Sequence, residues 1–309
     1  MEFELSEDQK AILDSVEALV ARHAGAERAI ALAAKAEYDG DFESALVEAG
    51  FFELGVEAGP LEAALMVEAA ARGSAVAAVG ARALVAPQVS EGQTLDGPVA
   101  LARAGTDAPV RFGAHARYAL VLDGDAARLV SLTAGDTSPV RSNFGFPMGR
   151  IDSSVLGGGE DLGPGSGDRL RRWWRVATAV ETAGTLRAAL DVTLRYVKER
   201  RQFGRAIGSF QGVQHRLAYA AVQAEGARWL ALEAADLGAP EELSAVAAAY
   251  AAAAAKTVFD ETHQFSGAMG FTREHDLHVS SMRLQALRLE LGGVEAHRRA
   301  VALSRWPVS

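Results

Sequence analysis

The part of the chain after residue 165 restricts the fold most, because it reads as long helices joined by short connections. Helical patterns cover about residues 168–201, 211–237, 241–266 and 276–305. Pro240, in the connection before the third pattern, suits a first helical turn, and the alanine-rich sequence that follows favours helix. Gly292-Gly293 predicts a break in the last one. Four long helices with short connections predict an antiparallel four-helix bundle over residues 166–309.

The first ninety residues also read as mostly helical. Ser6 and Gln9 have the spacing of a capping box at the start of a helix. Further helices are expected over residues 41–49 and 61–72, and an apolar segment over residues 75–85 is expected to be halted by Pro87. We therefore expect an N-terminal helical domain over residues 1–90.

Between these helical parts the pattern changes to short β-type runs. Residues 118–122 and 128–132 read as a hairpin, because Asp123-Gly124 supplies the positive φ angles of a tight turn. Residues 157–167 contain six glycines and one proline and read as a linker. No Gly-Lys-Ser/Thr follows them, so a phosphate-binding loop is rejected. The expected fold class is α+β, mainly α, with a reduced β-domain and linker over residues 91–165.

Composition excludes several classes of function. The net charge of −9 disfavours a nucleic-acid partner, which needs a clustered positive field. The absence of cysteine excludes disulfides, thiolate metal sites and thiol nucleophiles. The acidic amino terminus does not read as a signal peptide, and the longest apolar run is too short to cross a membrane. The expected location is the cytoplasm.

The most specific string lies where the first bundle helix is expected to end. Residues 199–204 read Glu-Arg-Arg-Gln-Phe-Gly, and Phe210-Gln211 follows. An ordinary alternative is a helix that ends at Gly204 with its arginines at the negative end of the dipole. The string resembles the Arg-x-x-Phe-Gly…Phe-Gln signature of acyl-CoA dehydrogenases, in which arginine and glutamine contact the FAD of a neighbouring subunit. The resemblance assigns FAD contacts to Arg200, Gln202, Phe203 and Gln211.

A second string supports the same family. Residues 264–272 read Gln-Phe-Ser-Gly-Ala-Met-Gly-Phe-Thr and resemble the family's Gln-x-x-Gly-Gly-x-Gly-Phe segment. In the family, this glutamine and the glycine backbone approach the adenosine part of FAD. The alternative is an ordinary glycine-containing helix break. The resemblance assigns contacts to Gln264, Gly267 and Ala268, although Ala268 stands where the family usually has glycine.

The family's catalytic base is missing from both of its usual positions. The resemblance places one position at Leu291, twenty residues after Phe271, and the other at Trp174, immediately before an arginine. Neither side chain can take a proton. Glu290 is adjacent to the first position, but one residue of helix rotates a side chain by about 100° and would aim it elsewhere. Glu181 lies two turns beyond the second position, roughly 10 Å along the axis, and is expected to be a poor substitute.

The resemblance therefore implies a subunit that lacks its own base. The family's flavin-ring loop and Trp-containing strand are also not found between residues 91 and 165. Such short subunits resemble the partners in heteromeric α2β2 acyl-CoA dehydrogenases of actinobacteria, which act on CoA thioesters of steroid side chains. The implied partner is a longer subunit that supplies the base, with FAD shared across the interface. Two alternatives stay open: a degenerate scaffold homo-oligomer without flavin, and a homomeric enzyme that uses Glu290.

Two other clusters are interpreted as structural. His275 and His278, with Glu274, have a spacing that could bind metal, but no third ligand or second shell is identifiable, so a solvent-facing helix is expected. Trp173 and Trp174 are interpreted as bundle core or interface. No metal site is predicted.

Overall fold

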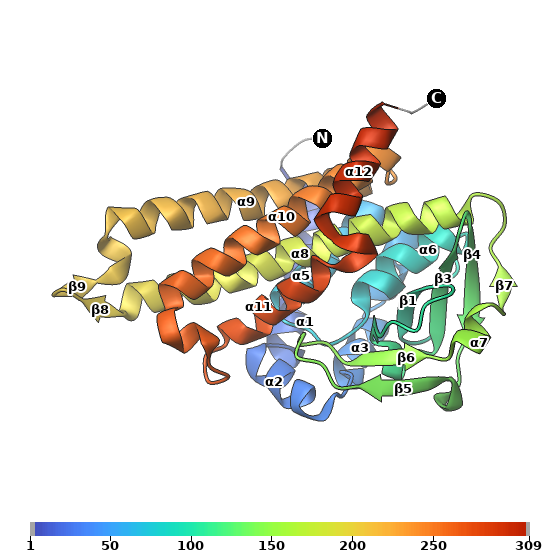
Figure 1. Cartoon of the computed structure of the whole chain (residues 1–309), viewed down its shortest axis with the longest axis horizontal. Coiled ribbons are helices and arrows are strands. Elements are labelled where there is room, and N and C mark those ends of the chain that lie inside the picture. The colour runs from blue at the N-terminus through green and yellow to red at the C-terminus, as the bar shows by residue number, and fades with distance from the viewer. Residues whose placement is uncertain (1–3, 307–309) are drawn as a thin grey trace.

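The computed structural model describes residues 4–306, and it begins with a group of helices (Figure 1). These elements are α1 (Glu7–His23), α2 (Ala26–Lys35), α3 (Gly40–Glu48), η1 (Phe51–Glu53), α4 (Leu54–Glu57), α5 (Pro60–Arg72), η2 (Gly80–Val85) and α6 (Ala86–Val89). The capping box is confirmed, because the Ser6 hydroxyl accepts from the Gln9 amide and the Gln9 side chain accepts from the Ser6 amide.

One expectation for this part is wrong, and one helix was not predicted. Pro87 does not halt the apolar segment, because the π-helical η2 continues directly into α6 and Pro87 lies in its first turn. Proline is tolerated there, since a first-turn amide has no partner inside its own helix. The helix α2 was not expected, although its sequence is amphipathic and its residues Ala26, Ala29 and Ile30 pack in one apolar cluster.

The middle of the chain forms two small sheets. The elements are β1 (Val99–Arg103), β2 (Val110–Arg111), η3 (Gly113–His115), β3 (Tyr118–Asp123), β4 (Ala126–Ser131), η4 (Ala134–Asp136), β5 (Thr137–Val140), β6 (Met148–Ile151), α7 (Ser153–Leu156) and β7 (Glu160–Asp161). One sheet has the order β1-β3-β4-β7, in which β1 and β3 are parallel, and the other has the order β2-β6-β5.

The predicted hairpin is confirmed. Asp123 pairs with Ala126 at its end, and Gly124 has a φ of 62° in the turn. The glycine-rich stretch is not wholly a linker, because β7 lies within it and pairs with β4. Gly159 lies so close to the sheet that an added Cβ would be 2.4 Å from the Leu129 carbonyl oxygen.

The remaining elements form the helical bundle. They are α8 (Ser166–Glu199), β8 (Arg201–Gln202), β9 (Arg205–Ala206), η5 (Ile207–Ser209), α9 (Gln211–Asp236), α10 (Glu241–Ser266), η6 (Gly267–Phe271), α11 (Leu277–Leu287), η7 (Glu290–Gly292) and α12 (Gly293–Arg305). The predicted α+β, mainly α class is confirmed, and the predicted break in the last helix falls at η7.

Helix α8 is the centre of the molecule. It lies between α5 and η2 on one side and α9, α10 and α11 on the other (Figure 1). Trp173 and Trp174 are both 4% exposed, which confirms that they belong to the core. Gly184 allows the close approach of α5, because a Cβ there would lie 2.3 Å from the Glu68 carbonyl oxygen.

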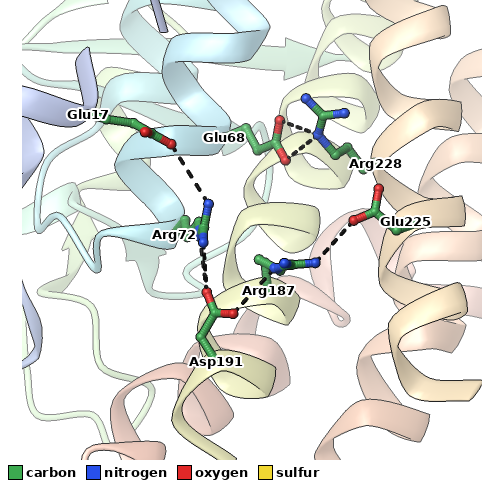
Figure 2. Close-up of polar contacts among 7 residues, drawn as sticks. All are labelled: Glu17, Glu68, Arg72, Arg187, Asp191, Glu225 and Arg228. Atoms are coloured by element: carbon green, nitrogen blue, oxygen red, sulfur yellow. Dashed lines mark hydrogen bonds and ion pairs between the residues drawn. The ribbon is translucent and has the colours of Figure 1, made fainter. Parts of the chain in front are cut away.

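Ion pairs also join the amino-terminal helices to the bundle (Figure 2). The Arg228 Nε lies 2.8 and 3.0 Å from the two carboxylate oxygens of Glu68, which links α9 to α5. Arg72 of α5 contacts Asp191 of α8 at 3.0 Å. Since each pair joins different helices, the network fixes how α5 lies against α8 and α9.

Candidate functional site

The seven residues assigned to FAD lie together at one end of the bundle. Arg200, Gln202 and Phe203 belong to the β8–β9 hairpin region, and Gln211 is the first residue of α9. Gln264 lies in the last turn of α10, and the segment after it is η6. All seven are exposed, and the hairpin is the tip at the left of Figure 1.

The hairpin has an unusual backbone and an unusual side chain. Helix α8 ends at Glu199, so the alternative of a helix continuing to Gly204 is wrong. Gln202 pairs with Arg205, and Phe203 and Gly204 between them have φ angles of 53° and 80°. Phe203 is 91% exposed. A non-glycine residue in the left-handed region with a fully exposed aromatic ring is typical of a functional or interface position.

Contacts between α9 and α10 bring the two strings together. Arg216 Nε of α9 lies 2.7 Å from Glu261 Oε2 of α10, and its guanidinium lies 4.9 Å from the centre of the Phe265 ring. Arg216 follows Gln211 by little more than one turn, and Phe265 follows Gln264 directly. The two predicted glutamines therefore belong to neighbouring helix ends.

The backbone after α10 is open. Gly267 has φ 57° and ψ −144°, a conformation that favours glycine, and nothing lies within 4 Å of the position a Cβ would take. Ala268 beside it is exposed. The substitution of alanine for the family's usual glycine therefore creates no clash within this chain.

The polar side chains assigned to FAD form no hydrogen bonds or ion pairs with the described part of the chain. Among residues 4–306, Arg200, Gln202, Gln211 and Gln264 make no side-chain hydrogen bond or ion pair. A guanidinium can donate two parallel hydrogen bonds to phosphate oxygens, and an amide can both donate and accept. This end of the bundle therefore offers free hydrogen-bonding groups to a polar anionic ligand.

The second candidate region contains the two expected positions of a catalytic base. Leu291 lies in η7 with φ 51° and ψ 28°, outside the helical range. Glu290 Oε2 accepts a hydrogen bond of 3.0 Å from Trp174 Nε1. The two positions, far apart in the sequence, therefore meet in space. The expectation that Glu290 aims elsewhere is wrong, because it assumed a regular helix and the backbone here is kinked.

Arg111 of β2 joins the carboxylates in this region. Its Nε lies 2.8 Å from Glu290 Oε1, and its Nη1 lies 2.7 Å from Glu181 Oε2. The three side chains are between 11% and 17% exposed. Glu181 was expected to be too distant, yet residues 174 and 181 are seven apart and share one face of α8. Arg111 links Glu181 to Glu290, which in turn accepts from Trp174. Both carboxylates are bound to one guanidinium.

The charges in this cluster are buried and mutually dependent. Burial raises the pKa of Glu181, although Arg111 opposes the shift. Burial alone would lower the pKa of Arg111, but Glu181 and Glu290 together raise it above its usual value. Arg111 therefore stays protonated and partly compensates the charge of the two carboxylates.

Another arginine and two aromatic rings fill the space beside the cluster. The Arg283 Nε donates to the Gly145 carbonyl at 3.1 Å and its Nη1 to the Ala75 carbonyl at 2.9 Å. Burial lowers the pKa of Arg283 to about 10, so it stays protonated at neutral pH. The Phe146 ring lies 5.1 Å from the Arg111 guanidinium and 4.9 Å from that of Arg283.

Little space is left around these side chains. Two cavities adjoin Glu181, each of about 20 Å³, and Phe112 lines both. A volume of that size holds about one water molecule. The region therefore has no room for an acyl chain beside Glu290. Sequence reasoning missed Arg111, because its partners are distant along the chain and no local motif marks it.

The histidine cluster has a structural role in this chain. The His275 ring packs edge-to-face on Tyr196 at 5.5 Å, and His278 Nδ1 lies 2.9 Å from the His275 carbonyl oxygen. The expected solvent-facing helix is wrong for both, since each ring is partly buried. Within residues 4–306, no group of three potential metal ligands occurs. None of the helices in that range has the length and apolarity needed to span a membrane.

Comparison with known protein families gives one match. The description "Acyl-CoA dehydrogenase, C-terminal domain" matches residues 172–304. The chain is also 33% identical over 180 residues to acyl-CoA dehydrogenase IpdE2 of Mycolicibacterium smegmatis, which covers 56% of this chain and 57% of that protein. The first two curated relatives are matched over 21% and 57% of their own length, so the likeness spans about a fifth of one and little more than half of the other.

Solved structures match over almost the whole chain. The ChsE4-ChsE5 complex from Mycobacterium tuberculosis superposes with a TM-score of 0.82 at 20% identity, covering 100% of both chains. A variant of the Tcur3481-Tcur3483 steroid ACAD gives a TM-score of 0.82 at 22% identity and covers 96% of this chain and 97% of that one. At these identities the likeness shows a shared fold.

Proposed function

We propose that the chain belongs to the acyl-CoA dehydrogenase family, because residues 172–304 match the C-terminal domain of that family. The chain is a subunit of an FAD-dependent enzyme that desaturates a CoA thioester between its α and β carbons. It contributes contacts to FAD but not the catalytic base. A longer homologous subunit supplies the base and the flavin-ring loop.

One contrast carries this proposal. The polar side chains of the two FAD strings are exposed and free, whereas both carboxylates near the expected catalytic position are bound to Arg111. A general base needs a free lone pair within reach of the substrate's proton. The Glu290 carboxylate instead accepts hydrogen bonds from Arg111 and Trp174. The chain is therefore equipped to bind a cofactor and not to abstract a proton.

The residues at the end of the bundle fit FAD as a shared ligand. When bound, the flavin accepts the hydride that leaves the β carbon of the substrate. Arg200 pairs with the pyrophosphate, and Gln211 and Gln264 hydrogen-bond the polar atoms nearby. Gly267 lets the cofactor approach the backbone, because no side chain covers it. Phe203 covers an apolar part of the cofactor or of the partner subunit.

The partner and the substrate follow from the relatives. A complex of two proteins, ChsE4-ChsE5, has the same fold, and a further structure of that fold is described as a steroid ACAD. We infer an α2β2 heterotetramer with the longer subunit, acting in the cytoplasm on the CoA thioester of a steroid side chain. The narrow cavities beside Glu181, one of which Glu290 also lines, support a substrate site provided mainly by the partner.

The first test is co-expression with a longer homologous subunit, followed by measurement of flavin content and of the mass of the native complex. The complex should contain both chains and FAD, and the chain purified alone should carry little flavin. A stoichiometric yellow flavin in the isolated chain would contradict the heteromeric assignment.

The second test addresses the FAD contact directly. Arg200→Ala should weaken FAD binding to the complex roughly ten- to hundredfold, because a charge-assisted hydrogen bond contributes about 1.5 to 3 kcal/mol. Helical content should be unchanged. Arg195→Ala, an equally exposed arginine one turn earlier on α8, is the control and should retain full occupancy at limiting FAD. Equal occupancy of both variants would refute the assignment.

The third test separates the proposal from a homomeric enzyme that uses Glu290. Removal of a true general base costs about 10²- to 10⁴-fold in rate. Glu290→Gln should change turnover of the complex by less than about tenfold. Turnover is measured as reduction of an electron acceptor by a CoA thioester at equal flavin content. A thousandfold loss with normal FAD binding would assign the base to this chain.

A further inference from the structure

A further pocket lies beneath α11, next to the second FAD string, since Gly270 and Phe271 line it. It has a volume of about 460 Å³ and is enclosed by α2, residues 142–145, the end of α10, and η6 and α11. None of the seven FAD residues lines it, and neither do Arg111, Glu181 and Glu290. Its size is within the range of about 300 to 1,000 Å³ that is usual for small-molecule sites.

A buried histidine without partners faces this pocket. His263 is 6% exposed, and neither ring nitrogen has a hydrogen-bond partner among the described residues. Burial lowers the pKa of His263, so the ring is neutral at neutral pH, with one donor and one acceptor. Buried polar groups of proteins are nearly always paired, and a group left without a partner needs an explanation. A ligand oxygen would supply one.

The walls beside His263 are flat and apolar. The rings of Phe259 and Phe271 have centroids 4.2 and 4.6 Å from that of His263. Phe271 is 73% exposed, so part of its face is available at the rim. Ile30 and Val279 line the pocket from α2 and α11. Aromatic faces and aliphatic side chains favour a flat apolar body.

A metal ion does not suit the pocket. His263 and His278 are its only lining residues of the usual ligand types, and the Nδ1 of His278 already contacts the His275 carbonyl. Three protein ligands are the usual minimum at a zinc site. We propose that the pocket binds a flat, largely apolar small molecule whose hydroxyl or carbonyl oxygen forms a hydrogen bond with His263.

The test compares 2-naphthol with naphthalene, which has the same ring system without the oxygen. Calorimetric titration of the purified chain should give one saturable site for each probe. The hydroxyl should strengthen binding about fivefold, equivalent to about 1 kcal/mol for one hydrogen bond. The ring nitrogen signals of His263 in an NMR spectrum should shift with 2-naphthol and much less with naphthalene.

Three variants locate the site. Ala33→Trp places a large side chain at an exposed lining position and should abolish binding of both probes. Ala31→Trp, on the exposed surface of the same helix outside the lining, should retain it. His263→Phe should keep naphthalene binding and lose the preference for the hydroxyl. Absence of saturable 2-naphthol binding to the unmodified chain, or binding that survives Ala33→Trp, would overturn the proposal. Both readouts are independent of FAD content.

Discussion

Replacement of Arg111 by methionine tests how far this arginine stabilises the buried carboxylates of Glu181 and Glu290, which together with Arg111 form the acidic cluster. Methionine keeps much of the length and apolar stem of arginine but removes its charge. Glu181 and Glu290 would then remain 12% and 17% exposed, with no cation in direct contact. Removing one partner of a buried ion pair costs about 3 to 5 kcal/mol, because the other charge is left without compensation. We expect a loss of that size in the free energy of unfolding at neutral pH.

The loss should depend on pH in a definite direction. Burial already raises the pKa of Glu181, and removal of Arg111, which opposes that shift, raises it further above the unfolded value of about 4.3, so the folded state binds a proton more tightly. A raised carboxylate pKa stabilises the folded state at low pH, and that contribution is lost as pH rises through the folded pKa. The difference between Arg111→Met and the unmodified chain should therefore shrink between about pH 7 and pH 5.

The measurement is urea unfolding followed by circular dichroism at several pH values. Arg103→Met, at an exposed position on the strand β1, is the matched control and should change stability by less than about 0.5 kcal/mol. Adding Glu181→Gln and Glu290→Gln to Arg111→Met should recover most of the loss, because no uncompensated charge remains. A loss below about 1 kcal/mol for Arg111→Met, with no pH dependence, would refute the reasoning.

Three further predictions concern stability and use the same unfolding assay. Arg228→Met should lower the free energy of unfolding by about 3 kcal/mol, because it leaves Glu68 buried without its cation. The double variant with Glu68→Leu should recover most of this loss, and additive losses would contradict the reasoning. Gly184→Ala should cost about 1 to 3 kcal/mol, because its Cβ would lie 2.3 Å from a carbonyl oxygen of α5; a neutral effect would argue against the close packing. Burial lowers the pKa of His297 to about 4, below its unfolded value. The free energy of unfolding should therefore fall by about 2 kcal/mol between about pH 7 and pH 5, because the unfolded state gains a proton. His297→Gln should remove that part of the pH dependence.

The helical bundle could be predicted because its determinants are local. Proline at the start of α10, glycines at the break near η7, and alanine-rich periodicity each act within one turn of the chain. Helix α10 accordingly begins and ends at the predicted residues, and α8 ends only two residues before its expected limit. Helix α2 escaped prediction, because it has only ten residues and its amphipathic pattern therefore spans few turns.

The two regions of the candidate site, the FAD strings and the acidic cluster, also differ in how far the sequence predicted them. The FAD strings are contiguous, so their sequence alone identified seven residues that lie at one end of the bundle. The acidic cluster depends on Arg111, which is 70 residues from Glu181 and 179 from Glu290. No periodicity encodes a contact of that separation. The kink at Leu291 added to the difficulty, because a rotation of 100° per residue applies only to a regular helix.

The ion pairs of Arg111 also explain why a single substitution at residue 291 should not restore a catalytic base. Arg111 already binds the carboxylates of Glu181 and Glu290. Leu291→Glu would add a carboxylate next to Glu290 whose charge this guanidinium cannot compensate, and an uncompensated buried charge costs stability. The cavities beside Glu181 are also too small for the reacting carbons of a substrate. Under the proposed function, charge and volume together therefore prevent residue 291 from acting as a base in this chain.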